Sequence, residues 1–244
     1  MSLRLTLATA ARVLRQLRSD RRTIALLIVV PCVLLGLIAW IYNGTPVFDS
    51  IGPALLGIFP MTVMFIVTSI ATLRERTSGT LERLLASPLH KADLMFGYAA
   101  AFALVALVQA LIVVAFAVWV CGLDVRGEVW LLGLVGVFDA VLGTALGLLA
   151  SGFARTEFQA VQFMPAFIFP QMILCGLFME RSKLPTGLSQ LSNVLPLSYA
   201  VDAMQAVQTQ AAAGGEVAKN IAIIAGFALL SLALGSLTLR RRTA

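Results

Sequence analysis

The sequence carries little charge for its length. Of its 244 residues, 12% are Asp, Glu, Lys or Arg and 59% are hydrophobic, whereas about a quarter of the residues in a soluble domain are charged. A soluble fold of this length has too little interior to hide so much apolar surface from water. The composition therefore excludes a soluble enzyme, an extracellular disulfide scaffold and a disordered chain, and it indicates an integral membrane protein.

The sequence also lacks the residue patterns of membrane-embedded catalysis. It has neither the GxxxxGK[ST] loop that binds nucleotide phosphates nor an HExxH zinc motif. Asp139 is the one carboxylate well inside an apolar run, and the single histidine, His90, lies outside those runs. The three cysteines, Cys32, Cys121 and Cys175, match no metal or redox spacing. We therefore expect no catalytic residues, no metal and no cofactor in this chain.

Six apolar runs are long enough to cross a bilayer as helices, which takes about 20 mostly apolar residues. A helix satisfies its own backbone hydrogen bonds in hydrocarbon, so it is the expected form. The predicted fold is an all-α integral membrane protein with six transmembrane helices. A single transmembrane domain is expected over residues 23–239, with spans at about 23–42, 50–73, 94–121, 129–154, 158–179 and 220–239.

The basic residues orient these spans. With a cytoplasmic amino terminus, the inner segments hold fourteen basic residues, and the outer segments hold four: Arg126, Arg181, Lys183 and Lys219. Such a bias favours both termini in the cytoplasm of a bacterial cell, with a basic cytosolic tail at 240–244. Because the net charge of +6 is spread along the chain, nucleic acid is not an expected partner.

Residues 1–22 are expected to form a cytosolic interfacial helix. Apolar side chains over residues 3–18 fall on one stripe at 100° per residue, formed by Leu3, Leu7, Ala10, Leu14 and Leu17. A basic helix with an apolar stripe binds membrane lipids in the plane of their headgroups. The alternative is a plain cytosolic extension of the first span.

A second amphipathic segment follows the second span. Ser78 or Thr80 can start a short helix, Pro88 ends it, and Leu81, Leu84 and Leu85 form its apolar side. Such a helix can insert into a groove on a soluble partner. A solvated helix that merely joins two spans is the alternative.

This segment resembles the signature of the ABC-2 type transporter permeases. The matching positions are Glu75, Arg76, Gly79, Thr80, Leu81, Glu82, Leu84, Leu85 and Pro88. Residues 195–203, Leu-Pro-Leu-Ser-Tyr-Ala-Val-Asp-Ala, look like the Asn-Pro-Leu-Thr-Tyr stretch of the family, with Leu195 where Asn is common. The two matches agree with the topology over nearly the whole chain.

The resemblance implies a function. In that family the segment is the coupling helix, so residues 75–88, including Arg83, would dock on a separate ATP-hydrolysing subunit that binds ATP and Mg. It also implies pairing with a second permease copy or a paralogue, and export of drugs, antibiotics, lipids or polysaccharides. The apolar stretch at 167–172 resembles the drug-efflux members and suits bulky amphiphiles.

The outer segment between the last two spans, residues 180–219, is expected to hold two short helices in the outer leaflet. Pro185 and Pro196 bracket the first, and the second runs over 200–213 until Gly214 and Gly215 end it. In the family such helices close the outer end of the substrate path. Prolines in the fifth span suit a gate, although a kink without a moving part is the alternative. The expected path or gate residues are Pro165, Phe169, Pro170, Met172, Pro196 and Tyr199.

Asp139 is the remaining candidate site. It lies near Gly136, Gly143 and Gly147 on the helix, and a small-xxx-small pair marks a helix-packing face. The carboxyl group is therefore expected to face another helix or a cavity. It could bind a cationic substrate, relay a proton or serve as a structural hydrogen-bond partner. Two alternatives to an ATP-driven exporter follow, namely a proton-coupled secondary carrier that uses Asp139, and a membrane anchor or sensor that transports nothing.

Overall fold

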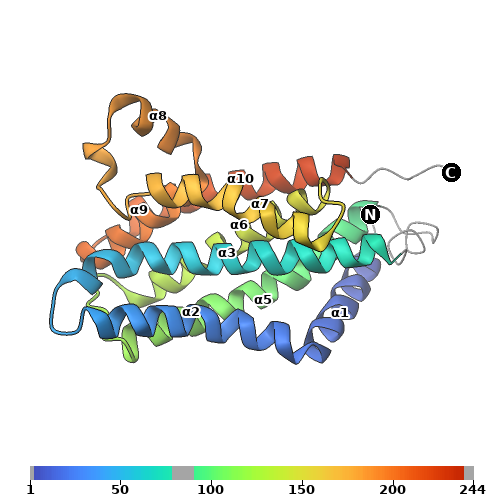
Figure 1. The fold of residues 1–244 in the computed structure, drawn as a ribbon, viewed down its shortest axis with the longest axis horizontal. Helices are drawn as coiled ribbons and strands as arrows, with labels where there is room; N and C mark the ends of the chain where they lie inside the picture. Colours follow the sequence, from blue (N-terminus) through green and yellow to red (C-terminus); the bar gives the residue numbers. More distant parts are fainter. Residues whose placement is uncertain (1–2, 79–90, 239–244) are drawn as a thin grey trace.

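The computed structural model describes residues 3–78 and 91–238, and the regular structure within those ranges is helical. Figure 1 shows the arrangement of these elements. In chain order they are α1 (Leu3–Ser19), α2 (Arg21–Ile41), α3 (Val47–Thr77), α5 (Lys91–Trp119), α6 (Val129–Ser151), α7 (Glu157–Leu174), the 3-10 turn η1 (Arg181–Lys183), α8 (Thr186–Val194), α9 (Pro196–Thr209) and α10 (Gly214–Thr238). The all-α prediction is confirmed for the described residues.

Five of these helices, α2, α3, α5, α6 and α10, are long and apolar enough to cross a membrane. The predicted fifth span corresponds to α7, which has 18 residues and carries one glutamate, three glutamines and two prolines. Because of those polar residues, α7 is less apolar than the five helices that could cross a membrane. The multi-pass membrane class is confirmed, and the six-span layout stays a prediction.

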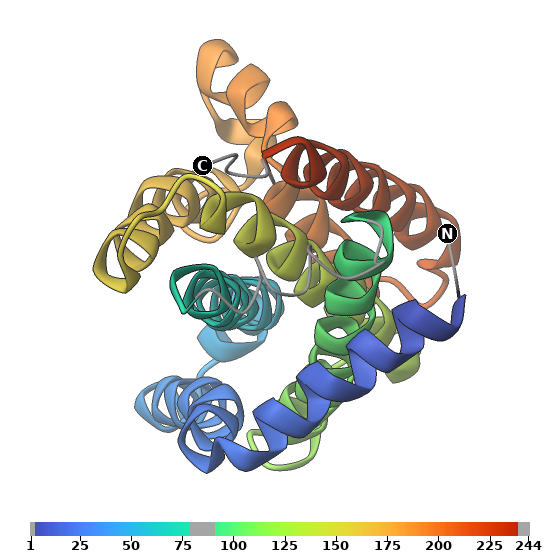
Figure 2. The same cartoon turned by 90° about the vertical axis from the view of Figure 1, so that its right-hand side faces the viewer.

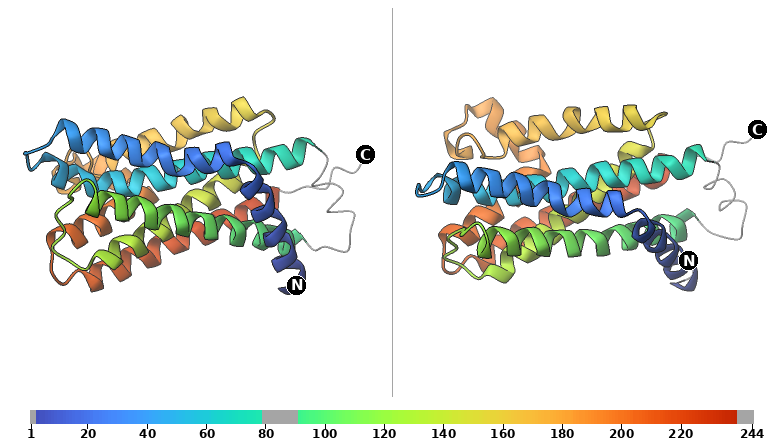
Figure 3. Two further views of the ribbon diagram at one scale, coloured as in Figure 1. Left: turned by 90° about the horizontal axis from the view of Figure 1, so that it is seen from below. Right: turned by 60° about the horizontal axis from the view of Figure 1, so that its bottom comes forward.

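The long helices run side by side, and α1 crosses one end of the bundle (Figure 3). The most buried of the five spans is α6, which packs against α3, α5, α9 and α10. The least buried is α2, which lies at the edge of the bundle when it is viewed end-on (Figure 2). The apolar surface that α2 presents outward therefore faces lipid or a partner.

Two glycines bring α6 against α3. A Cβ atom at Gly143 would lie 2.3 Å from the carbonyl oxygen of Met61, and one at Gly147 would lie 2.6 Å from that of Phe65. These distances are too short for a real side chain, so the two backbones touch along this face. The helix-packing contact predicted from the spacing of these glycines is confirmed.

The three tryptophans lie at the end of the bundle opposite α1. Trp40, Trp119 and Trp130 are 62–78% exposed and occur near the last residues of α2 and α5 and the first residues of α6. Indole rings concentrate where hydrocarbon meets water. Their position is typical of side chains at a membrane boundary, and the arginine-rich helix α1 lies at the opposite end of the bundle.

Several helices end at other residues than the predicted membrane spans. At its carboxyl end α3 runs to Thr77 instead of residue 73, and Ser78 is its C-cap residue instead of the start of a new helix. At its end α7 stops at Leu174 instead of 179, because Gly176 turns the chain with a φ of +103°, which glycine adopts without strain. The other spans begin or end a few residues away from the predicted positions.

The outer segment, residues 180–219, contains two short helices as predicted, but the second of them has other bounds than the predicted 200–213. The second helix, α9, runs from Pro196 to Thr209. Proline suits the first position of a helix because the N–H that it lacks has no partner there in any case. Gly214 and Gly215 begin α10 and do not end the preceding helix. The last long helix therefore starts six residues earlier than predicted.

Candidate coupling and substrate-path sites

The first feature at the end of the bundle that carries α1 is the crossing of α1 over α5. A Cβ atom at Gly97 would lie 2.6 Å from the side chain of Thr9 and 2.9 Å from the carbonyl oxygen of Thr6. Thr6 also donates a hydrogen bond of 3.5 Å to Asp93. The crossing is therefore close, and α1 is packed onto the bundle instead of extending freely from α2.

The buried face of α1 differs from the predicted stripe. Its buried residues are Thr6, Thr9, Ala10, Val13 and Leu17. Ala10 and Leu17 of the predicted stripe belong to this buried face, whereas Leu3 and Leu7 are 76% and 58% exposed. Helical periodicity finds an apolar side but cannot say whether protein or lipid covers it. The exposed leucines remain available for a membrane surface.

A clamp formed by Arg12, Glu75 and Tyr98 joins α1 to α3 and α5. Both terminal nitrogens of Arg12 donate to the two carboxylate oxygens of Glu75, at 2.9 and 3.0 Å. The guanidinium also donates to the hydroxyl of Tyr98 at 2.9 Å and lies over its ring. The side chains of Arg12 and Glu75 are only 25% and 13% exposed, so this pair is protected from screening. Glu75 was predicted as a coupling residue, whereas Arg12 and Tyr98 were not.

Two further contacts hold the last turn of α3. Arg76, also a predicted coupling residue, donates to the carbonyl oxygen of Ser151 at the end of α6. Arg74 forms a bidentate pair with Glu157, at 2.7 and 3.1 Å, near the start of α7. The hydrogen bond from Arg74 lowers the pKa of Glu157. The stabilisation by this pair is present at neutral pH and is lost as the pH falls below the usual range of a glutamate.

The end of α3 is thus attached to α1, α6 and α7 directly before the predicted coupling helix. The remaining coupling residues, Gly79, Thr80, Leu81, Glu82, Arg83, Leu84, Leu85 and Pro88, lie outside the described residues. A displacement applied to the segment after Thr77 would reach three neighbouring helices through named polar contacts.

Asp139 lies in the interior of the bundle. It is 0% exposed, and neither carboxylate oxygen has a hydrogen-bond partner among the described residues. The prediction that it faces protein is confirmed. No structural hydrogen bond of Asp139 is found there, and the residue does not line the pocket described below.

The predicted gate residues of α7 lie within a continuous helix. Pro165 and Pro170 are both inside α7. Phe169 points away from the bundle and is 48% exposed, whereas Met172 packs against the cluster that contains Ile168. The predicted path residues on this helix therefore split between the outward and inward faces.

Gln171 connects α7 to α9 and was not predicted as a site residue. Its side-chain oxygen accepts a hydrogen bond of 3.2 Å from the backbone N–H of Leu197. Pro196, buried at the start of α9, directly precedes this contact. A movement of α7 would therefore carry the start of α9 with it.

In the outer segment, Arg181 forms hydrogen bonds that join residues of α8 and α9. Arg181 donates to Ser192 at 2.8 Å, to Asn193 at 2.6 Å and to Asp202. Its guanidinium lies 5.4 Å from the ring centre of the predicted gate residue Tyr199, whose hydroxyl donates to the carbonyl oxygen of Asn193 at 2.7 Å. Burial raises the pKa of Asp202, and the charge and hydrogen bond of Arg181 oppose that rise.

Replacing Arg181 with glutamine is expected to loosen residues 180–202, measured as faster amide hydrogen exchange and a lower melting temperature. Unpaired Asp202 is then stable mainly in its neutral form, so the deficit should be small near about pH 4 and should grow toward neutral pH. Lys183→Gln is the matched control, because its pair with Glu180 is 67% exposed on both sides and such pairs contribute little. Equal exchange in the two variants would contradict this role for Arg181.

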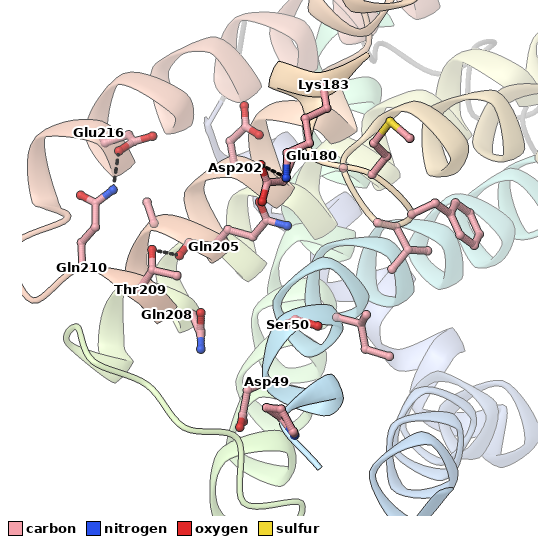
Figure 4. A pocket seen from close by; sticks show the side chains of 17 residues that line it. Asp49, Ser50, Glu180, Lys183, Asp202, Gln205, Gln208, Thr209, Gln210 and Glu216 are labelled. Atoms are coloured by element: carbon pink, nitrogen blue, oxygen red, sulfur yellow. Dashed lines mark hydrogen bonds and ion pairs between the residues drawn. The ribbon is translucent and has the colours of Figure 1, made fainter. Parts of the chain in front are cut away.

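A pocket of about 790 Å³ lies at the same end of the bundle. Figure 4 shows Asp49 and Ser50 from α3 facing Gln205 and Thr209 from α9, with Glu216 from α10 at one side. Asp49 accepts a hydrogen bond from the backbone N–H of Asp124, and Glu216 accepts one from Gln210. None of the predicted path residues lines this polar pocket.

The sequence is similar to those of known ABC transporter proteins. A family model described as ABC-2 type transporter matches residues 4–209. The chain is 31% identical over 150 residues to the probable multidrug ABC transporter permease YbhR of Escherichia coli K12, which covers 62% of this chain and 41% of that protein. It is 22% identical over 191 residues to the probable multidrug ABC transporter permease YbhS of the same organism, covering 78% and 51%.

A third relative comes from a eukaryote. The ABC transporter G family member 20 of Dictyostelium discoideum is 27% identical over 157 residues, covering 64% of this chain and 22% of that protein. The chain therefore spans between about a fifth and about half of the length of these curated relatives.

The fold and the contacts at the α1 end of the bundle define a multi-pass helical membrane protein in which the last turn of the long helix α3 is held by its neighbours. The chain belongs to the ABC-2 type transporter family.

Proposed function

We propose that this chain is the membrane-spanning subunit of an ATP-driven exporter. The observation that carries the proposal is the continuity of α3, which has 31 residues and a length of about 46 Å. One end of α3 contributes Asp49 to the pocket of about 790 Å³, and the other end contributes Glu75 to the clamp with Arg12 and Tyr98. A single helix thus connects the predicted coupling segment with the far side of the bundle.

The mechanism is conformational. A separate ABC ATPase subunit binds ATP and Mg and docks on the segment after Thr77. Its closure moves α3 together with the helices attached to it, and the membrane domain shifts between inward- and outward-facing states. This chain contributes the path and the coupling contacts, and the partner contributes the hydrolysis.

The assembly is proposed to contain a second copy of this chain or a paralogue. The helix α7, proposed to be the fifth of six spans, presents an outward apolar face. Its residues Phe158, Phe169 and Ile173 are 48–74% exposed in the single chain. A partner permease would cover this apolar face. With six spans both termini lie on the same side of the membrane, and the exposed arginines of α1 favour the cytoplasm for that side.

The proposed substrates are drugs and other amphiphiles that leave the cell. Two relatives are named multidrug permeases, and a third, from Bacillus subtilis, is named a linearmycin resistance permease protein. Export of lipid or polysaccharide by the same fold is the nearest alternative.

Co-purification tests the proposed assembly. The full chain is expressed with candidate ABC ATPases encoded by neighbouring genes and isolated in mild detergent. We expect one ATPase to co-purify and its hydrolysis in lipid vesicles to respond to amphiphilic drugs. A chain that purifies without any of them would contradict the proposal.

A proton-coupled carrier remains a distinct candidate because the buried Asp139 has no hydrogen-bond partner within residues 3–78 and 91–238. For an ATP-driven exporter, the isosteric change Asp139→Asn is expected to leave drug-stimulated ATPase activity within about twofold, because the neutral amide avoids the cost of a buried charge. Asp139→Lys is the contrasting variant and is expected to prevent folding. A loss of transport together with its pH dependence in Asp139→Asn would favour the carrier.

A further inference from the structure

The helix α2 contains a proline, Pro31, in its middle, and the helix continues on both sides of it. Proline has no backbone N–H, so the carbonyl oxygen four residues earlier, that of Leu27, loses its usual partner within the helix. Leu27 is 2% exposed and lies in the part of α2 that can cross a membrane. No water satisfies such an oxygen in hydrocarbon, so a neighbouring group of the protein has to donate to it.

Gln109 of α5 supplies that donor. Its side-chain nitrogen donates to the carbonyl oxygen of Leu27 at 3.1 Å, and Gln109 is 1% exposed within the span of α5. The side-chain oxygen of Gln109 has no hydrogen-bond partner among the described residues. Burying an amide with an unpaired oxygen is costly. The hydrogen bond that offsets this cost goes to the carbonyl oxygen freed by Pro31.

The other prolines inside long helices have no comparable donor. In the described part of the chain these prolines are Pro53, Pro60, Pro165 and Pro170. The carbonyl oxygens four residues before them accept no hydrogen bond from a side chain within residues 3–78 and 91–238. The pairing with a glutamine 82 positions away is therefore particular to α2.

The bond from Gln109 also ties α2 to α5. Among the described residues, it is the one hydrogen bond that joins residues 23–41 of α2 to another helix. Because α2 is the least buried of the five long apolar helices, packing alone holds it less firmly than the others. A single buried hydrogen bond therefore has a large share in placing this helix.

The tie closes a frame of three helices. Asp20 is the single residue between α1 and α2, and it accepts hydrogen bonds from the backbone N–H and the hydroxyl of Thr23 in the first turn of α2. The helix α1 crosses α5 at Gly97. Gln109 brings α2 back to α5 about 18 Å further along that helix. The position of α1, and with it that of Arg12, depends on this frame.

We propose that Gln109 is a positioning residue, which replaces the hydrogen bond missing at Pro31 and holds the first half of α2 on α5. The bond keeps α1 where Arg12 reaches Glu75, and it thereby supports the coupling of ATP hydrolysis to drug binding. The effect on the carbonyl oxygen of Leu27 is independent of what the protein transports, whereas the effect on coupling rests on the function proposed above.

Melting temperatures of the full chain in detergent test the bond. Gln109→Met keeps most of the side-chain volume but removes the donor, so the unpaired carbonyl oxygen should lower the melting temperature by a few degrees. Pro31→Ala restores a backbone N–H that can donate to Leu27 within α2. In the Pro31→Ala background, Gln109→Met should therefore lower the melting temperature by roughly half as much or less.

Pro165→Ala is the matched control. Pro165 also lies inside a helix, α7, but Gln109 donates to α2 and not to the carbonyl oxygen that Pro165 frees. The effects of Pro165→Ala and Gln109→Met should therefore add. Gln109→Leu is a second variant without a donor and should behave as Gln109→Met does. Equal losses in the unmodified, Pro31→Ala and Pro165→Ala backgrounds would overturn the proposed replacement of the missing bond.

Drug-stimulated ATPase activity in lipid vesicles, measured with the co-purifying ATPase, tests the positioning role. Gln109→Met should reduce the stimulation several-fold. With Pro31→Ala added, the melting temperature should recover while the stimulation stays low, because α2 then satisfies its own carbonyl oxygen but is still not tied to α5. Recovery of both would overturn the positioning role. An unmodified protein without stimulated hydrolysis would contradict the proposed function instead, and the melting temperatures would still decide the bond.

Discussion

Replacing Arg12 with alanine is expected to separate drug binding from ATP hydrolysis. The change leaves the Glu75 carboxylate, which is 13% exposed, and the Tyr98 hydroxyl without their shared donor. Removing one member of a buried pair is costly because the other charge stays desolvated, and for this partly exposed pair we expect about 2 kcal/mol of stability lost. The bond between α1 and α3 is lost as well. Drug stimulation of ATPase activity should fall roughly tenfold.

Two further variants make this result specific. Arg74→Ala breaks a pair of similar geometry at the same end of α3, but its side chains are 58% and 49% exposed, so we expect about 0.5 kcal/mol or less. The charge exchange of Arg12→Glu with Glu75→Arg should restore part of the coupling. If Arg12→Ala and Arg74→Ala reduced stimulation equally, the clamp would have no special role.

Adding one methyl group at Gly143 is expected to destabilise the bundle severely. The new Cβ atom would lie 2.3 Å from the carbonyl oxygen of Met61, which is backbone and cannot rotate aside as a side chain can. Overpacking of well-packed interiors costs about 1 to 3 kcal/mol, and contact with backbone places Gly143→Ala at the upper end. The measurement is the melting temperature in detergent, together with the yield of folded protein. Gly143→Val should not fold.

Gly226→Ala provides the matched control. This glycine is also inside a long helix, α10, but a Cβ atom there meets nothing within 4 Å. Since alanine favours helix over glycine by about 1 kcal/mol in water, this variant should be as stable as the original or slightly more so. A similar loss in both variants would show that the α3–α6 contact is not as close as described.

Local patterns in the sequence predicted the features that depend on neighbouring residues. Long apolar runs located the membrane helices because the backbone must satisfy itself in lipid, and the spacing of Gly143 and Gly147 revealed a packing face of α6. Pro185 and Pro196 marked the ends of α8. In each case the cause lies within a few residues of the effect.

Features that depend on distant residues escaped prediction. Arg12 and Glu75 are 63 positions apart, and nothing in either neighbourhood selects one partner from the many basic residues. Arg181 and Asp202 pose the same problem in the outer segment. Periodicity identified Ala10 and Leu17 of α1, which are buried, but not Thr6 and Thr9, which are buried as well because they are small enough to approach Gly97 closely.

Uptake by inverted membrane vesicles tests the central claim most directly, namely that ATP hydrolysis on a partner subunit drives export through this chain. Vesicles containing the full chain and its co-purifying ATPase are given a fluorescent amphiphilic drug, with ATP or with an imposed proton gradient. The account predicts uptake that requires ATP, stops with vanadate and persists with a protonophore. Uptake that follows the proton gradient, needs no ATP and is lost in Asp139→Asn would contradict it.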